Sequence, residues 1–141
     1  MNLQHFFNDV LRNGGASYNI TTGEYNPTSG YFVSLPNFEQ KIPLSEFTQE
    51  TVKDYINSNS AELSNEFSFL GGWVSDGIVY LDVSRQYFDK RFALNLAVNG
   101  GQMAVYDAYN GVNIELPTPQ RAGTMQQNRS YMTFKINELC K

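Results

Sequence analysis

The stretch that decides the fold is residues 67–87, FSFLGGWVSDGIVYLDVSRQY. Two runs rich in β-branched and aromatic residues flank Asp76-Gly77 within it. An Asp-Gly pair between such runs is among the strongest local signals for a β-hairpin, because both turn residues adopt positive φ. The stretch therefore predicts two antiparallel strands joined by a tight turn.

The second strand of this hairpin alternates in character along its length. Its apolar positions are Val79, Leu81 and Val83, and its other positions are Tyr80, Asp82 and Ser84. Because successive side chains of a strand point to opposite faces, the apolar set is expected to face the core. Tyr80 and Asp82 then share the opposite face, which is either a binding surface or a side covered by a helix.

Three helices are expected outside this hairpin, over residues 3–13, 48–59 and 89–99, because apolar residues recur there at helical spacing. Thr48 and Asp89 are suitable N-cap residues. The third helix is expected to bury Phe92, Ala93, Leu96 and Ala97. Asn-Gly-Gly ends the first and third helices, which fits either a local duplication or two ordinary helix stops.

The fold class expected from these elements is α+β. A second Asn-Gly hairpin is predicted at Asn110-Gly111. The prediction is one domain over residues 1–117, with a mostly antiparallel sheet packed by about three helices. Residues 118–141 are expected to form a basic C-terminal tail, with an edge strand at residues 131–136.

The charge of the chain is −4, from 10 Lys and Arg against 14 Asp and Glu. Nucleic-acid binders show a basic surplus, so nucleic acid is not an expected partner except through the basic tail. No run approaches the ~20 apolar residues of a membrane span, and the first residues do not resemble a signal peptide. A membrane partner is therefore not expected, and the location expected is the cytoplasm.

Catalytic motifs are missing from the sequence. It has one histidine, His5, and one cysteine, Cys140, at opposite ends of the chain, and no cluster with metal-ligand spacing. No phosphate loop, dinucleotide fingerprint or nucleophile motif is present. The expectation is a protein without enzymatic activity, metal or cofactor. The remaining catalytic hypothesis is a carboxylate pair of Asp82 and Asp107, which requires their strands to be neighbours.

Aromatic residues give the strongest functional signal, because Tyr and Trp carry much of the binding energy at protein interfaces. They cluster around the central hairpin and the strand that follows the third helix. The expected partner-binding set consists of Trp73, Tyr80, Asp82, Tyr106, Asp107 and Tyr109. Stacking of nucleic-acid bases on the aromatic members is the alternative use of such a set.

Residues 30–117 resemble a family of small uncharacterised accessory proteins encoded by bacteriophages and plasmids. The matching features are the strand Val-Tyr-Leu-Asp-Val-Ser at 79–84, a short Ala/Leu helix and the strand Gln-Met-Ala-Val-Tyr-Asp at 102–107. The resemblance implies an origin in a mobile element and a location in a bacterial host cytoplasm. It carries no known catalytic set, so it assigns no functional residue.

The function expected from these observations is that of a non-enzymatic accessory protein that binds and inhibits a host defence protein or complex. One alternative is a structural or assembly component of a virion. A further alternative is a protein that binds a small nucleotide signal in a subunit interface, since a homo-oligomer is compatible with the sequence.

Overall fold

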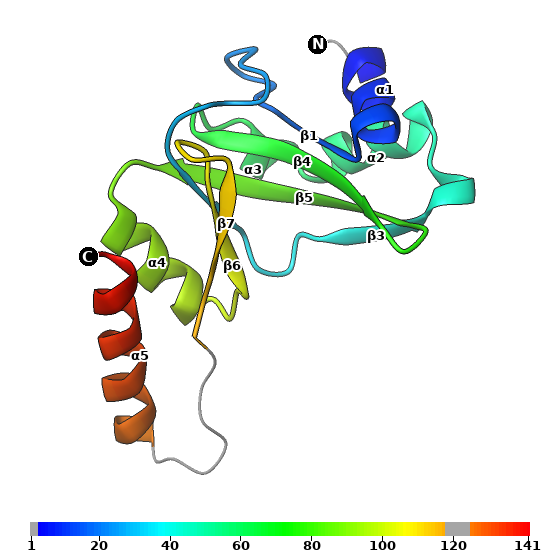
Figure 1. Cartoon of the computed structure of the whole chain (residues 1–141). Coiled ribbons are helices and arrows are strands. Elements are labelled where there is room, and N and C mark those ends of the chain that lie inside the picture. The colour runs from blue at the N-terminus through cyan, green and yellow to red at the C-terminus, as the bar shows by residue number, and fades with distance from the viewer. Residues whose placement is uncertain (1–2, 118–124) are drawn as a thin grey trace. The chain divides into compact units, whose positions relative to one another are not determined.

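The computed structural model describes residues 3–117 and 125–141 of the chain (Figure 1). These residues form two units, which we call unit 1 and unit 2. Unit 1 comprises the residues up to Pro27 and the segment Leu35–Gln86, and unit 2 comprises Thr28–Ser34 and the residues from Tyr87 onward. Both units combine helices with antiparallel strands, so the α+β prediction is confirmed. The prediction of one domain over residues 1–117 stays a prediction.

Unit 1 is built on the predicted hairpin, whose strands β4 and β5 are the two long strands in Figure 1. The turn residues Asp76 and Gly77 have φ of 52° and 75°, as an Asp-Gly turn between strands requires. β1 pairs with β4, and β3 pairs with β5, both in antiparallel register. The elements of this unit are α1 (Leu3–Asn13), β1 (Gly15–Tyr18), β3 (Gln40–Pro43), η1 (Leu44–Glu46), α2 (Gln49–Ser58), α3 (Ser60–Leu63), β4 (Ser68–Ser75) and β5 (Ile78–Tyr87).

The core of unit 1 lies on the face of the hairpin that the alternation predicts. Val79, Leu81 and Val83 are fully buried there, and every buried residue of α1, α2 and α3 packs against the same cluster. Burying a side chain of this size stabilises a fold by roughly 1.5–3 kcal/mol, so this face supplies the main driving force of the unit. The opposite face carries Tyr80 and Asp82 with their cross-strand neighbours, and farther along the hairpin it carries the buried pair Phe69 and Ser84.

Helix α1 packs closely against the sheet at Gly72. A Cβ atom at this position would lie 2.9 Å from Phe6 Cζ and 2.9 Å from Val10 Cγ2, both on α1. Gly72 therefore has a packing role, because only a residue without a side chain lets α1 reach this depth. Its cross-strand partner Leu81 is fully buried on the same face.

Unit 2 joins a three-stranded antiparallel sheet to two helices. Its elements are β2 (Tyr31–Ser34), α4 (Lys90–Asn99), β6 (Ala104–Asp107), β7 (Val112–Glu115) and α5 (Met125–Leu139). β6 pairs with both β2 and β7. The second hairpin forms as predicted, although its connection spans four residues, and only Gly111 among them has positive φ.

The N-caps and bounds of the predicted helices are confirmed. The Thr48 side chain accepts from the backbone N–H of Thr51, and the Asp89 side chain accepts from that of Phe92. The buried face of α4 differs from the prediction, because Ala93, Leu94 and Ala97 form it while Phe92 and Leu96 are exposed. The small alanines let α4 pack closely on the sheet of unit 2.

The edge strand predicted at residues 131–136 is wrong, because this segment belongs to helix α5. Met132 and Ile136 are buried and four residues apart, which places them on one face of a helix, and Ile136, Leu139 and Cys140 pack into the core of unit 2. Residues 118–124 of the predicted basic tail lie outside the described residues. No helix in the described part of the chain is long and apolar enough to cross a membrane.

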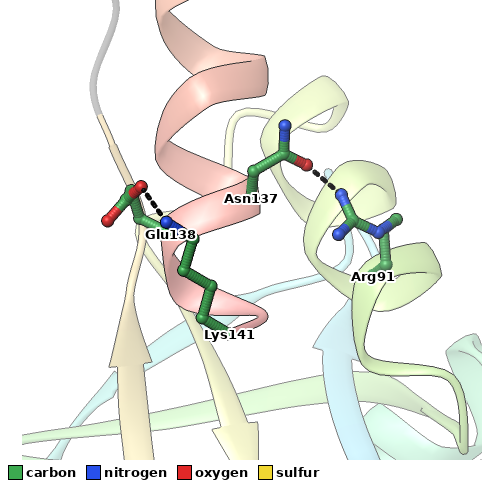
Figure 2. Close-up of polar contacts among 4 residues, drawn as sticks. All are labelled: Arg91, Asn137, Glu138 and Lys141. Atoms are coloured by element: carbon green, nitrogen blue, oxygen red, sulfur yellow. Dashed lines mark hydrogen bonds and ion pairs between the residues drawn. The ribbon is translucent and has the colours of Figure 1, made fainter.

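Polar contacts also join α5 to its surroundings in unit 2. Figure 2 shows Arg91 of α4 donating through its guanidinium to the side-chain oxygen of Asn137. It also shows the ion pair between Lys141 and Glu138. Their Nζ and Oε1 atoms are 3.0 Å apart. This last pair is exposed and three residues apart on the chain, so we expect it to contribute little to stability.

Substitution of Gly72 tests the packing of α1. We expect Gly72→Ala to lower the free energy of unfolding by about 1–3 kcal/mol, because the added methyl group overpacks the contact with Phe6 and Val10. Leu11→Ala removes an exposed side chain from the same helix and is expected to change stability by no more than about 0.5 kcal/mol. Urea unfolding measures both, and equal stability of the two variants would contradict the packing.

Candidate functional site

A row of side chains crosses four strands of unit 1 on the face opposite the core. Register places Gly15 of β1 beside Trp73 of β4, Trp73 beside Tyr80 of β5, and Tyr80 beside Lys41 of β3. Directly paired residues of antiparallel strands share a face, so these four positions form one line, which we call the aromatic row. It brings together Trp73 and Tyr80 of the predicted set.

The rings of the aromatic row are stacked. The ring centroids of Trp73 and Tyr80 are 4.1 Å apart, and the ring planes differ by 11°. Lys41 Nζ lies 5.8 Å from the Tyr80 ring centroid, within the range of a cation–π contact. Trp73 nevertheless keeps 43% of its surface exposed. A large, rigid, exposed aromatic group of this kind is typical of a binding site.

Asp82 lies in the neighbouring row on the same face, opposite Gly71 of β4. Its carboxylate leans across the hairpin, because a Cβ atom built at Gly71 would come within 2.2 Å of Asp82 Oδ1. Gly71 and Trp73 are two residues apart on β4 and share a face. The Asp82 carboxylate therefore lies over Gly71, which is the neighbour of Trp73 along β4 on this face.

The other three residues of the predicted set belong to unit 2. Tyr106 is exposed, and its ring centroid lies 6.4 Å from that of Phe32. Tyr109 is 51% exposed, and its ring forms an edge-to-face pair with that of Tyr31. Asp107 has a different environment, since only 4% of it is exposed. Its carboxylate accepts from Asn110 Nδ2 at 2.7 Å and from the Asn110 backbone N–H at 3.3 Å. Asp107 thus holds the β6–β7 connection together.

The carboxylate pair proposed for catalysis requires β5 and β6 to be neighbours. β6 pairs with β2 and β7, and it does not pair with β5. Asp82 and Asp107 also belong to different units. Strand pairing therefore does not bring the two carboxylates together, and Asp107 has a structural use in its own hairpin.

A polar cluster that the sequence did not suggest joins α1 to the segment that follows β1. Tyr25 Oη donates to Asp9 Oδ2 at 2.7 Å, and Asn26 Nδ2 donates to the same oxygen at 3.2 Å. Asn13 donates to the other carboxylate oxygen. The His5 ring stacks on Tyr25 with centroids 4.6 Å apart. We call this group the Asp9 cluster. No sequence motif marks it, because its members are spread between residue 5 and residue 26.

The electrostatics of the Asp9 cluster favour a structural role. The hydrogen bond from Tyr25 holds the pKa of Asp9 below its ordinary value, against the opposing effect of burial, and the bonds from Asn26 and Asn13 lower this pKa further. Burial and the hydrogen bond to Asp9 raise the pKa of Tyr25. A tyrosine with a raised pKa stays protonated at neutral pH, so it serves here as a hydrogen-bond donor to α1.

Charge divides unevenly between the units. Unit 1 holds ten acidic and four basic residues, a balance of −6, whereas unit 2 holds four acidic and six basic residues, a balance of +2. The aromatic row therefore belongs to a strongly acidic unit. Such a field attracts cationic partners and repels phosphate groups.

The described residues contain further surface features that could bind a ligand or partner. A groove of about 340 Å³ in unit 2 lies between β7 and α5, and it is lined by Glu115, Leu116, Pro117, Lys135, Glu138 and Leu139. No group of three or more His, Cys, Asp and Glu side chains in residues 3–117 and 125–141 could hold a metal ion. Large apolar side chains are exposed on unit 2, among them Phe88, Phe92, Met103 and Phe134.

Comparison with known proteins assigns no family or function to the chain. No protein-family model, no curated protein and no solved structure matches the chain. The aromatic row is therefore the main functional signal in the described residues.

The Asp9 cluster makes a prediction about pH. Because the folded-state pKa of Asp9 lies below its ordinary value of 3.8, its hydrogen bonds stabilise the fold fully above about pH 5. This contribution is lost as the pH falls below 3.8 and through the folded-state pKa. We expect Asp9→Asn to lose less stability than the wild type between pH 6 and pH 3, as measured by urea unfolding at constant ionic strength.

A second carboxylate of the same segment provides the control for this experiment. Glu24 is exposed, so Glu24→Gln is expected to keep the pH dependence of the wild type. If Asp9→Asn loses stability in parallel with the wild type, the Asp9 carboxylate makes no special contribution to the fold.

Proposed function

We propose that the chain is a non-enzymatic accessory protein of a bacteriophage or related mobile element. It acts in the cytoplasm of a bacterial host, where it binds a host defence protein or complex and inhibits it by occupying a surface that this partner needs. The observation that carries the proposal is the exposed Trp73–Tyr80 stack of unit 1. The resemblance of residues 30–117 to phage and plasmid accessory proteins supports the mobile-element origin.

The structure of the aromatic row suits a protein partner. Interface hot spots are enriched in Trp and Tyr that are rigidly held and surrounded by other contacts. Trp73 is held from one side by Tyr80, and Tyr80 is flanked in turn by Lys41. The side chains lose little conformational freedom on binding, because the stack already restrains them in the free protein.

A second candidate function, a virion or assembly component, has its own supporting observation. Unit 2 exposes large apolar side chains on α4 and α5, namely Phe92, Leu96 and Phe134. Side chains of this kind are typical of surfaces that become covered when copies of a chain associate. A closed ring or a polymer in size-exclusion chromatography with light scattering would favour assembly, whereas a monomer or dimer would favour the inhibitor.

Binding to a host partner tests the leading proposal. We expect immobilised wild-type protein to retain a partner from host extract at micromolar concentration, and we expect Trp73→Ala to weaken binding of the purified partner. A hot-spot residue contributes about 2 kcal/mol or more, which corresponds to roughly a 30-fold increase in Kd. Isothermal titration calorimetry with the purified partner measures this change.

Phe92→Ala, at a position outside the predicted partner-binding set, serves as the matched control for this experiment. It removes an aromatic side chain of similar exposure from unit 2, and we expect it to leave the Kd unchanged. The proposal is contradicted if no partner is retained, or if Trp73→Ala binds the partner as tightly as the wild type while its unfolding midpoint is unchanged.

A further inference from the structure

One side of the Trp73 ring has no neighbour in the aromatic row. Its other side lies against Tyr80 in a nearly parallel stack, so the remaining ring face points away from β5 and toward β1. The residue that β1 places beside Trp73 is Gly15, which has no side chain. The aromatic row therefore consists of Lys41, Tyr80 and Trp73, followed by a position over Gly15 that has no side chain. We call this position the Gly15 slot.

The Gly15 slot is not closed by the tryptophan itself. Aromatic side chains in sheets often fold over a glycine on the neighbouring strand, which would fill such a position. A Cβ atom built at Gly15 has Gly72 O at 3.2 Å, Trp73 Cβ at 3.6 Å and Trp73 Cα at 3.9 Å as its nearest neighbours. No atom of the indole ring comes closer than these, because the ring stands toward Tyr80.

Acidic groups give the slot its charge preference. The Asp82 carboxylate lies over Gly71, two residues from Trp73 on the same face of β4. Gly15 and Gly71 are diagonal neighbours of the β1–β4 pair, about 7–8 Å apart, so a planar group over Gly15 has this carboxylate beyond its edge. Unit 1 as a whole has a balance of −6, which favours a cationic occupant.

We propose that the Gly15 slot takes the guanidinium group of an arginine side chain from the protein partner. This inference rests on the proposed function and names the contact that the aromatic row makes. The guanidinium is planar and cationic, so it stacks on the open face of Trp73 and directs N–H donors from its edge toward the Asp82 carboxylate.

Other occupants fit the slot less well. A lysine ammonium group is a compact, strongly hydrated charge and cannot stack as a plane. A nucleotide base can stack on Trp73, but its phosphates are repelled by the acidic field of unit 1. An uncharged aromatic ring gains nothing from the Asp82 carboxylate. The combination of an open indole face and an adjacent carboxylate selects arginine.

The single tryptophan of the chain allows a direct test, because all indole emission comes from the residue that borders this slot. The probes are three short capped peptides, Gly-Xaa-Gly-Xaa-Gly, in which Xaa is arginine, lysine or citrulline. We expect the arginine peptide to produce a saturable change in Trp73 emission. We expect its affinity to exceed that of the lysine peptide several-fold, within the roughly 2- to 30-fold range that a cation–π contact supplies.

A variant with a side chain in the Gly15 slot tests whether the arginine binds there. Gly15→Val adds a side chain on the open side of Trp73 and leaves Trp73, Tyr80 and Asp82 in place. Gly15 does not have positive φ, and valine favours a strand, so the variant is expected to fold, with some loss of stability because its Cβ lies 3.2 Å from Gly72 O. A cooperative urea-unfolding transition and an unchanged far-ultraviolet circular dichroism spectrum check this. Asn113→Val adds the same side chain at an exposed position of β7 and is the matched control.

We expect Gly15→Val to lose the preference for arginine over lysine and Asn113→Val to keep it. The inference is overturned if the arginine and lysine peptides bind the wild type equally, if citrulline matches arginine, if no saturable change occurs at millimolar peptide, or if Gly15→Val binds the arginine peptide as the wild type does.

The outcomes separate this inference from the proposed function. If Trp73→Ala loses the host partner and Gly15→Val keeps it, the slot is not the point of contact, while the proposed binding function stands. If the arginine preference is present but host extract contains no partner, the slot stands and the proposed function fails.

Discussion

The register of the β4–β5 hairpin is the constraint on which unit 1 depends. The Asp76-Gly77 turn sets this register, and a shift by one residue would turn the side chains of one strand to the other face of the sheet. In the observed register Val79, Leu81 and Val83 meet the helices, and Gly72 lets α1 approach the sheet. The same register puts Trp73 beside Tyr80 on the other face. The register of this hairpin therefore determines both the core of unit 1 and the geometry of the candidate site.

The two faces of this hairpin have separate roles. Substitutions on the face of the aromatic row therefore leave the core side chains unchanged. Glycines contribute to each face, since Gly72 makes room for a helix, whereas Gly71 makes room for the Asp82 carboxylate and Gly15 leaves one side of Trp73 open. The Asp9 cluster secures the segment that follows β1 to α1 through a carboxylate with a lowered pKa. Unit 2 has a core of its own, in which α4 and α5 contribute Ala93, Ala97 and Ile136.

The sequence predicts much of the fold because its strongest signals are local. The Asp-Gly turn, the alternation of β5 and the caps Thr48 and Asp89 each depend on residues within a few positions. The edge strand at 131–136 is wrong because a short alternation also fits a helix whose buried residues, Met132 and Ile136, are four apart. Of the predicted site, Trp73 and Tyr80 come together through register, whereas the role of Asp107 and the Asp9 cluster depend on contacts that no local pattern encodes.

The measurement that tests the central claim most directly is a nuclear Overhauser experiment on the aromatic protons of Trp73. The account predicts cross-peaks from the indole ring to the Tyr80 ring and none to the methyl groups of Val79 or Leu81, because those side chains lie on the other face of the sheet. Cross-peaks from the Trp73 indole to these methyl groups, without any to Tyr80, would show a different register and would contradict both the core and the site described for unit 1.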